Sequence, residues 1–395
     1  MAWGLRLRVW LALAAAAGGG GIVRGQWQTY ETTHYIVRTD LGPDCAREAN
    51  LRTEVLFDAY LARTQAPKRL LEDKLELWLF RNHTEYATRG GRHTGGVYNG
   101  SHLLVYVGTK TKEHDWAIVQ HEATHQFVHK VLQGNIPLWV NEGLACYFGN
   151  ALFTGDSYVF GHAPEDAVED VKGGFNNNTN FKPLAEFMQI DGGKWSQDIE
   201  QSRGRSGRNY LQAWSLVYFL MHADNGRYRP AFETCLRDAG RGESWQACWT
   251  RQFTADARVL DAAWRSFWRN QPRDPTHAVY AEAIARTLTV YLARASAQGQ
   301  RFATAADFFT AAQGGLLRQS DADWLPPALV FERVQEAMKL GSWTLQAVGP
   351  RLELVCNTNK GLIAAGTFEL KDGRVENLRA KVVSKYSTSR PLASP

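Results

Sequence analysis

The chain has 395 residues, of which 44% are hydrophobic and 22% are charged, and these are ordinary values for a folded globular protein. This length allows two domains and a large hydrophobic core. The net charge of +5 is small for the length and has no block of basic residues behind it, which argues against nucleic-acid binding.

Residues 1–25 have the pattern of a secretory signal peptide. Arg6 and Arg8 give a positive start, an apolar core follows from Val9 to Ala17, and small residues come next. This core is too short to span a bilayer, and no later stretch approaches the roughly 18 apolar residues that a span needs. An uncleaved anchor or a misassigned start stays open as the alternative. We expect an exported protein, periplasmic or extracellular, with no transmembrane segment in the mature chain.

The pattern of residues 26–110 predicts strands and a helix that together form the α/β part of a domain. The expected strands are 33–39, 74–80 and 102–107, and a helix is expected at 45–63. In the second strand Leu75, Leu77 and Leu79 alternate with polar residues, as a half-buried strand requires. A glycine-rich stretch at 95–100 precedes the third strand.

Residues 115–150 carry the strongest chemical signal. The motif His121-Glu122-Ala123-Thr124-His125 places two histidines four residues apart, so they share one face of a helix. Both imidazoles can then reach one metal ion, with Glu122 between them to hold a water on that metal. The apolar pattern predicts a buried helix from about Asp115 to Gln133.

A second helix is expected to complete the ligand set. Pro137 can start it, and it brings Glu142 back toward His125. Two histidines and one glutamate leave the fourth position of a zinc ion open, which is typical of a catalytic rather than a structural site. The alternative is a buried helix whose histidines have only a structural role.

The motif H-E-x-x-H followed by N-E-G-L-A at residues 141–145 resembles the gluzincin metallopeptidases, and the segment PLWVNEGLACYF resembles their peptidase MA-like members. The resemblance covers about residues 27–270. It implies a small mixed sheet with a zinc helix, followed by a helical half. It also implies that His121, His125 and Glu142 bind one zinc ion and that Glu122 is the general base.

Three further expectations rest on the same resemblance. Residues 96–99 are expected to form the sheet edge that binds the main chain of a peptide substrate, although a glycine-rich hairpin without such contact is as compatible with the sequence. Tyr210 is the candidate donor to the oxyanion, with a core tyrosine as the alternative. Many gluzincins carry an acid four residues after the ligand glutamate, where it orients a zinc-bound histidine. This chain has Cys146 there, so we expect either a weaker zinc affinity or another acid in the same role.

The remaining histidines and cysteines have weaker claims. His129 continues the face of His125 by one turn, and His222 ends an expected apolar helix at 209–224. For both histidines, a structural role is favoured over metal binding. The chain has five cysteines, and Cys235 with Cys248 is the pair that best fits a disulfide, because both lie in one helical stretch. An odd count leaves at least one thiol without an intramolecular partner.

The rest of the chain is expected to form a loop-rich segment, further helices and a second domain. Residues 151–205 contain many glycines, with one short helix expected after Pro183. Helices continue at 229–269, and a boundary is expected at 271–276. An α+β domain of unknown role is then expected at 277–383, with helices at 278–298, 302–313 and 326–339, strands at 343–348, 351–356, 362–370 and 374–383, and a disordered tail at 384–395.

These expectations add up to an α+β protein with a gluzincin-like catalytic domain and a smaller C-terminal domain. The expected function is that of a secreted zinc-dependent peptidase acting on peptides or proteins. Endopeptidase action is favoured, because the sequence has no motif of the kind that binds the N-terminal amino group of an aminopeptidase substrate. Two alternatives stay open: a degenerate relative that binds zinc or peptides without turnover, and a hydrolase of a different bond. The sequence does not specify an oligomeric state.

Overall fold

The computed structural model describes residues 27–65, 73–90, 94–109, 111–133, 135–175, 181–201, 207–253, 256–321 and 323–384. The predicted signal peptide and residues 385–395 of the predicted tail lie outside these ranges. The fold combines helices and sheets in two compact units, residues 1–151 with 163–275 and residues 152–162 with 276–395. The predicted α+β class is therefore confirmed. Among the described residues, none of the helices has the length and apolar character of a bilayer span.

The first unit is built on a mixed five-stranded sheet in the order β1-β2-β3-β5-β4. Its strands are β1 (Gln28–Glu31), β2 (Tyr35–Thr39), β3 (Leu75–Phe80), β4 (Gly96–Tyr98) and β5 (His102–Tyr106). β2, β3 and β5 run parallel, and β1 and β4 pair antiparallel at the two edges. Leu75, Leu77 and Leu79 are all buried, so the strand predicted at 74–80 is confirmed. The sequence did not predict β1, whose residues are mostly exposed.

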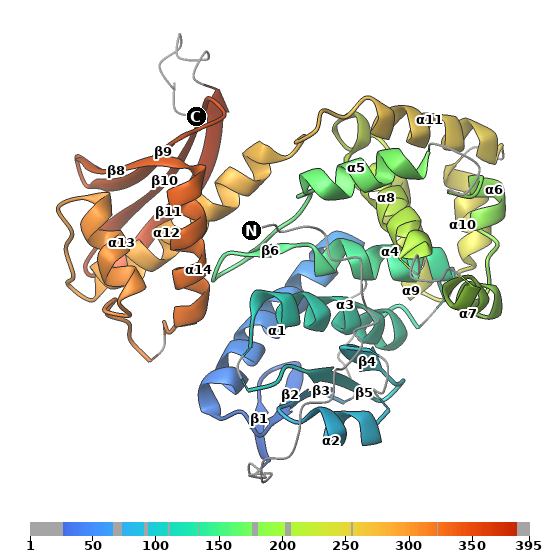
Figure 1. Cartoon of the computed structure of the whole chain (residues 1–395), viewed down its shortest axis with the longest axis horizontal. Coiled ribbons are helices and arrows are strands. Elements are labelled where there is room, and N and C mark those ends of the chain that lie inside the picture. Colours follow the sequence, from blue (N-terminus) through green and yellow to red (C-terminus); the bar gives the residue numbers. More distant parts are fainter. Residues whose placement is uncertain are drawn as a thin grey trace. The chain divides into compact units, whose positions relative to one another are not determined.

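Helices cover both faces of this sheet. α1 (Pro43–Thr64) and α3 (Glu113–Lys130) pack on one face, and α2 (His83–Thr88) lies on the other (Figure 1). The helical half follows, with α4 (Leu138–Gly149), α5 (Glu165–Gly174), α6 (Leu184–Phe187), α7 (Gly192–Gln201), α8 (Arg208–His222), the 3₁₀ turn η1 (Ala223–Asn225), α9 (Arg229–Gly240), α10 (Trp245–Gln252) and α11 (Ala257–Arg269). Cys235 and Cys248 join α9 to α10, which confirms the predicted disulfide.

Residues 151–205 are more regular than the sequence predicted. α5 buries Ala167, Val168 and Val171 on one face, and its last turn ends on Gly174. α7 begins at Gly192, and the helix predicted after Pro183 is present as α6. The expectation of a mainly irregular segment was wrong, because the glycine pairs at 173–174 and 192–193 lie at helix ends, where glycine is well tolerated.

Residues 152–162 belong to a different unit from the one that the predicted domain boundaries gave them. The sequence placed them inside one continuous domain at 27–270, whereas their contacts assign them to the second unit. There β6 (Leu152–Phe153) and β7 (Tyr158–Val159) form a hairpin. Asp156 of this hairpin pairs with Arg286 at 2.8 Å. Strands of two residues carry no periodic signal, so only long-range contacts reveal where the hairpin belongs.

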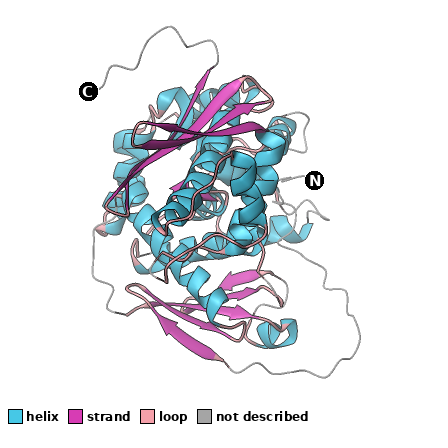
Figure 2. Cartoon of the chain, turned by 90° about the vertical axis from the view of Figure 1, so that its left-hand side faces the viewer, coloured by secondary structure: helices cyan, strands magenta, loops and turns pink. Residues whose placement is uncertain are grey.

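The rest of the second unit is a helical layer followed by an antiparallel sheet. Its elements are α12 (His277–Ala297), α13 (Ala305–Gln313), α14 (Pro327–Leu340), β8 (Gly341–Val348), β9 (Arg351–Thr358), β10 (Leu362–Lys371) and β11 (Arg374–Ser384). The four strands lie side by side in the order β11-β10-β9-β8 (Figure 2). Gly366 of β10 lies so close to α12 that a Cβ atom there would collide with Thr289. Every helix and strand predicted for this region is present.

Candidate metal centre

α3 supplies the first half of the site. The backbone N–H of Lys112 donates to the Asp115 carboxylate at 2.8 Å, so Asp115 caps the helix from inside its first turn. The helix buries Trp116, Val119 and Phe127, which fixes its rotation about its own axis. His121, Glu122 and His125 then share another face of α3. Their grouping follows directly from the helical period.

α4 supplies the second half, and two close contacts fix its position. A Cβ atom on Gly143 would lie 2.5 Å from Val217 Cγ2 and 2.7 Å from the Ala213 carbonyl oxygen of α8, so only glycine allows this approach. At the end of α4, the buried Gln120 side chain donates to the carbonyl oxygens of Phe148 at 2.9 Å and Ala151 at 3.1 Å. These contacts hold Glu142 against the two histidines.

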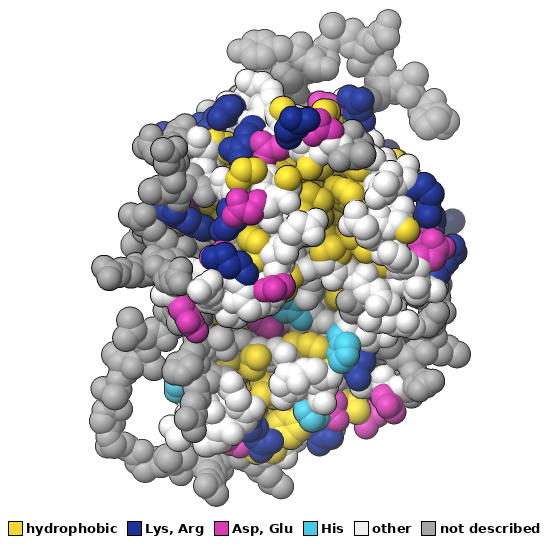
Figure 3. Space-filling model, turned by 90° about the vertical axis from the view of Figure 1, so that its right-hand side faces the viewer, with side chains coloured by type: hydrophobic (Ala, Val, Ile, Leu, Met, Phe, Trp, Pro, Cys, Tyr) yellow, Lys and Arg dark blue, Asp and Glu magenta, His cyan; other side chains and the backbone are white. Residues whose placement is uncertain are grey.

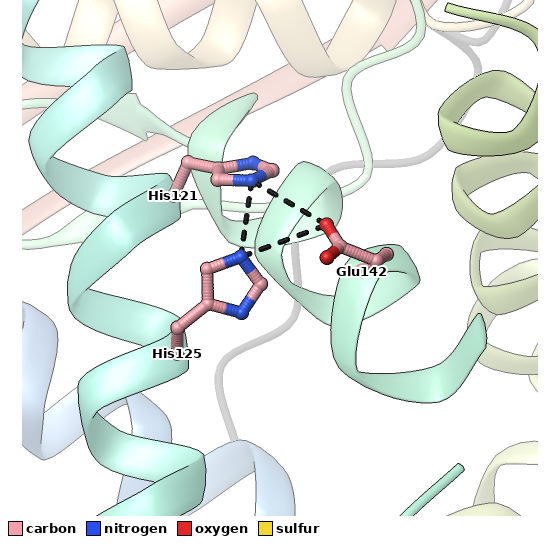
Figure 4. Close-up of side chains that lie close together, drawn as sticks. All are labelled: His121, His125 and Glu142. Atoms are coloured by element: carbon pink, nitrogen blue, oxygen red, sulfur yellow. Dashed lines mark hydrogen bonds and ion pairs between the residues drawn. The ribbon is translucent and has the colours of Figure 1, made fainter. Parts of the chain in front are cut away.

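The three predicted ligands converge on one point (Figure 4). His121 Nε2 and His125 Nε2 lie 3.3 Å apart. Glu142 Oε2 lies 3.7 Å from the first and 3.6 Å from the second. A tetrahedral ion with bonds of about 2.0–2.1 Å would hold its ligand atoms about 3.3–3.4 Å apart. The side chains therefore fit a metal ion with little movement.

Two hydrogen-bonding facts support a cation at this point. Glu142 Oε2 is buried and accepts no hydrogen bond from the described residues, although a buried carboxylate oxygen normally has a donor. His125 Nδ1 lies 2.9 Å from Asn141 Oδ1. An amide oxygen can only accept, so Nδ1 carries a proton, and in the neutral ring that binds a metal Nε2 has a lone pair directed at the same point.

The surroundings are electrostatically suited to a cation. Burial lowers the pKa of His121 well below its usual value, and His125 adds to the effect. Burial opposes a charged His125, but Glu142 and Glu122 outweigh it and raise the pKa of His125. Burial raises the pKa of Glu142, with Glu122 acting in the same direction. A divalent ion would relieve the cost of burying two carboxyl groups so close together.

Glu122 is held by the edge strand of the sheet. One carboxylate oxygen, Oε2, accepts the backbone N–H of Tyr98 at 3.0 Å. Gly96 allows the close packing, because a Cβ atom there would collide with Ile118 and lie 3.0 Å from Glu122 Cγ. The expected edge strand at 96–99 is thus present as β4, beside the metal group. Burial raises the pKa of Glu122.

Tyr210 lies beside the ligands. Its ring centroid is 6.4 Å from that of His121 and 5.3 Å from that of Trp195 on α7. Burial raises the pKa of Tyr210, and Glu142 adds to the rise. The hydroxyl therefore keeps its proton at neutral pH and can act as a donor.

Two other predicted candidates lie outside the ligand group. His222 contacts the Tyr147 hydroxyl at 3.1 Å, and burial lowers the pKa of His222 to about 4. His129 is exposed, and its Nδ1 lies 2.8 Å from the Tyr98 hydroxyl. Cys146 is buried, and burial raises the pKa of its thiol well above the usual value.

Sequence reasoning missed Asn141 and Gln120. Asn141 does for His125 what the missing acid was expected to do for a histidine. Its place immediately before Glu142 was the one available signal. Gln120 gave no signal, because its role depends on where the end of α4 lies.

Figure 3 shows a depression across one face of the molecule, with histidine and acidic side chains visible within it.

The comparisons with known proteins give one similarity. Residues 115–237 match the model of a family described as a protein of unknown function, DUF1570. No curated protein matches the chain, and no solved structure matches it. The matched segment contains His121, Glu122, His125, Glu142 and Tyr210, so the similarity covers the part of the chain that carries the site.

Proposed function

We propose that this protein is a zinc-dependent peptidase. The proposal rests above all on His121, His125 and Glu142, whose ligand atoms surround one point, with the carboxylate of Glu122 on the same helix face. Nitrogen and carboxylate ligands at these separations favour zinc among the common metals. A bound zinc ion would supply Lewis-acid chemistry and make water acidic near neutral pH.

The chain's own residues would divide the remaining work. Glu122 would take a proton from the attacking water and pass it to the leaving amine. Its raised pKa brings the carboxyl group closer to the pH at which a general base works best. The protonated hydroxyl of Tyr210 would donate a hydrogen bond to the oxyanion that forms at the carbonyl.

The proposed substrate is a peptide in extended conformation. β4 is an edge strand, so some of its backbone groups face away from β5 and can pair with a substrate main chain. Such pairing uses the backbone of the substrate and does not depend on its side chains, so it is compatible with cleavage within a peptide chain. The signal-like residues 1–25 support action outside the cytoplasm, in the periplasm or beyond the cell.

The test is cleavage of labelled casein by zinc-loaded protein, with Glu122→Gln as the matched variant. We expect chelator-sensitive cleavage by the wild type and none by Glu122→Gln at unchanged zinc content. Zinc binding without cleavage in either protein would favour a peptidase-like domain that binds zinc or peptides without turnover. Equal cleavage by both proteins would contradict the role of Glu122.

A further inference from the structure

Tyr98 connects the edge strand to the far end of the metal-binding helix. Its hydroxyl donates to the Gly100 carbonyl oxygen at 2.7 Å and lies 2.8 Å from His129 Nδ1. A tyrosine hydroxyl has one proton, and Gly100 receives it. His129 Nδ1 therefore donates to the hydroxyl. The bond joins β4 to the last turn of α3, one turn beyond His125.

β4 is a short edge strand. It contains three residues and pairs with β5 among the described strands, and its Val97 packs against a hydrophobic cluster. Short edge strands open more readily than central strands, because fewer hydrogen bonds hold them. The packing of Gly96 against Ile118 restrains its beginning, and the bond from His129 to Tyr98 restrains its end.

The backbone of Tyr98 is also the group that holds Glu122. Its N–H donates to Glu122 Oε2 at 3.0 Å, and Glu122 lies on α3 between Ile118 and His129. A shift of β4 along or away from α3 would therefore move or release this carboxylate. The side chain and the backbone of one residue thus connect His129 to the predicted general base.

We propose that the hydrogen bond between His129 and Tyr98 is a positioning device for Glu122, which keeps β4 against α3 and the carboxylate at a fixed place beside the metal group. Tyr98 and His129 are positioning residues here, because neither belongs to the ligand group. The inference rests on the proposed function for its catalytic consequence, but its structural part can be tested without turnover.

The first test is hydrogen exchange at the backbone amide of residue 98 in metal-free protein. Tyr98→Phe and His129→Ala should each accelerate this exchange about as much as Glu122→Ala, which removes the acceptor. His129→Asn should keep the wild-type rate, because its Nδ2 can replace the imidazole Nδ1 as a donor. Tyr30→Phe, at the opposite edge of the same sheet, is the matched control. Wild-type exchange in both Tyr98→Phe and His129→Ala would overturn the proposal.

The second test separates positioning from metal binding. In zinc-loaded protein, Tyr98→Phe should lower kcat on labelled casein about tenfold with KM changed less than about twofold. Zinc content should stay at the wild-type level. His129→Ala should lower kcat by a similar factor, and His129→Asn should keep the wild-type kcat. Accelerated exchange with unchanged kcat would overturn the link to Glu122. If the wild type itself cleaves nothing while the exchange result holds, the proposed function fails and the positioning of Glu122 stands.

Discussion

A buried carboxylate oxygen without a donor is costly, and Glu142 Oε2 has none among the residues that the structure describes. The two imidazole nitrogens that face it lie 3.7 and 3.6 Å away, beyond hydrogen-bond distance, and so do not remove this cost. A cation removes it, and it also suits the lone pair that Asn141 leaves on His125 Nε2. At the scale of single residues, a metal site explains the arrangement of the three ligands better than a structural contact between two helices does.

Asn141 is predicted to set the metal affinity. Replacing it with alanine removes the acceptor that fixes the His125 tautomer, and changes of this kind weaken metal binding about 10–100-fold. Cys146→Ala is the matched control on the same helix, and we expect it to keep the wild-type affinity. Zinc titration against a competing chelator measures both. Weaker binding in the cysteine variant alone would show that the thiol, and not Asn141, supports the ligands.

Tyr210 is predicted to affect the rate of turnover and not the binding of zinc. Removing one oxyanion donor lowers kcat about 10²–10³-fold in well-studied hydrolases, and we expect a loss of this order for Tyr210→Phe, with zinc content unchanged. Steady-state cleavage of labelled casein measures the loss. Wild-type kcat in this variant would leave Tyr210 as a packing residue against Trp195.

At the scale of elements, the approach of α4 to α8 is the contact that places Glu142. We expect Gly143→Ala to destabilise the protein by about 1–3 kcal/mol, because the new methyl group meets Val217 and the Ala213 backbone. In the last turn of α5, a methyl group added at Gly173 would meet none of the described residues within 4 Å, so Gly173→Ala should stabilise by about 0.5–1 kcal/mol. Urea unfolding measures both changes, and equal effects would contradict the packing argument.

The pH dependence of stability should include a contribution from α7. Its Asp198 is bonded by Lys194, Lys182 and Asn209, which lower the pKa of this carboxyl to about 2 despite an opposing burial effect. The folded pKa lies below the unfolded value of 3.8, so the charged form stabilises the fold above about pH 4, and this is lost as the pH falls toward about 2. The stability difference between wild type and Asp198→Asn should shrink over that range.

Urea unfolding at several pH values measures this difference, with Asp170→Asn, an exposed position on α5, as the control. A difference that stays constant down to the lowest pH at which the wild type folds would contradict the assignment.

At the scale of the whole molecule, local patterns predicted much of the fold. The H-E-x-x-H spacing needs only one helix, and the alternation of Leu75, Leu77 and Leu79 needs only one strand. The hairpin at 152–162 could not be assigned, because its membership in the second unit depends on contacts such as Asp156 with Arg286. The bond from Tyr98 to Glu122 also escaped prediction, since it depends on how β4 meets α3.

The central claim is that His121, His125 and Glu142 hold one metal ion, and zinc titration of metal-free protein by calorimetry tests it most directly. We predict one zinc ion per chain in the wild type and no stoichiometric binding in Glu142→Ala at the same protein concentration. Absence of binding in the wild type, or equal binding in both proteins, would contradict the claim.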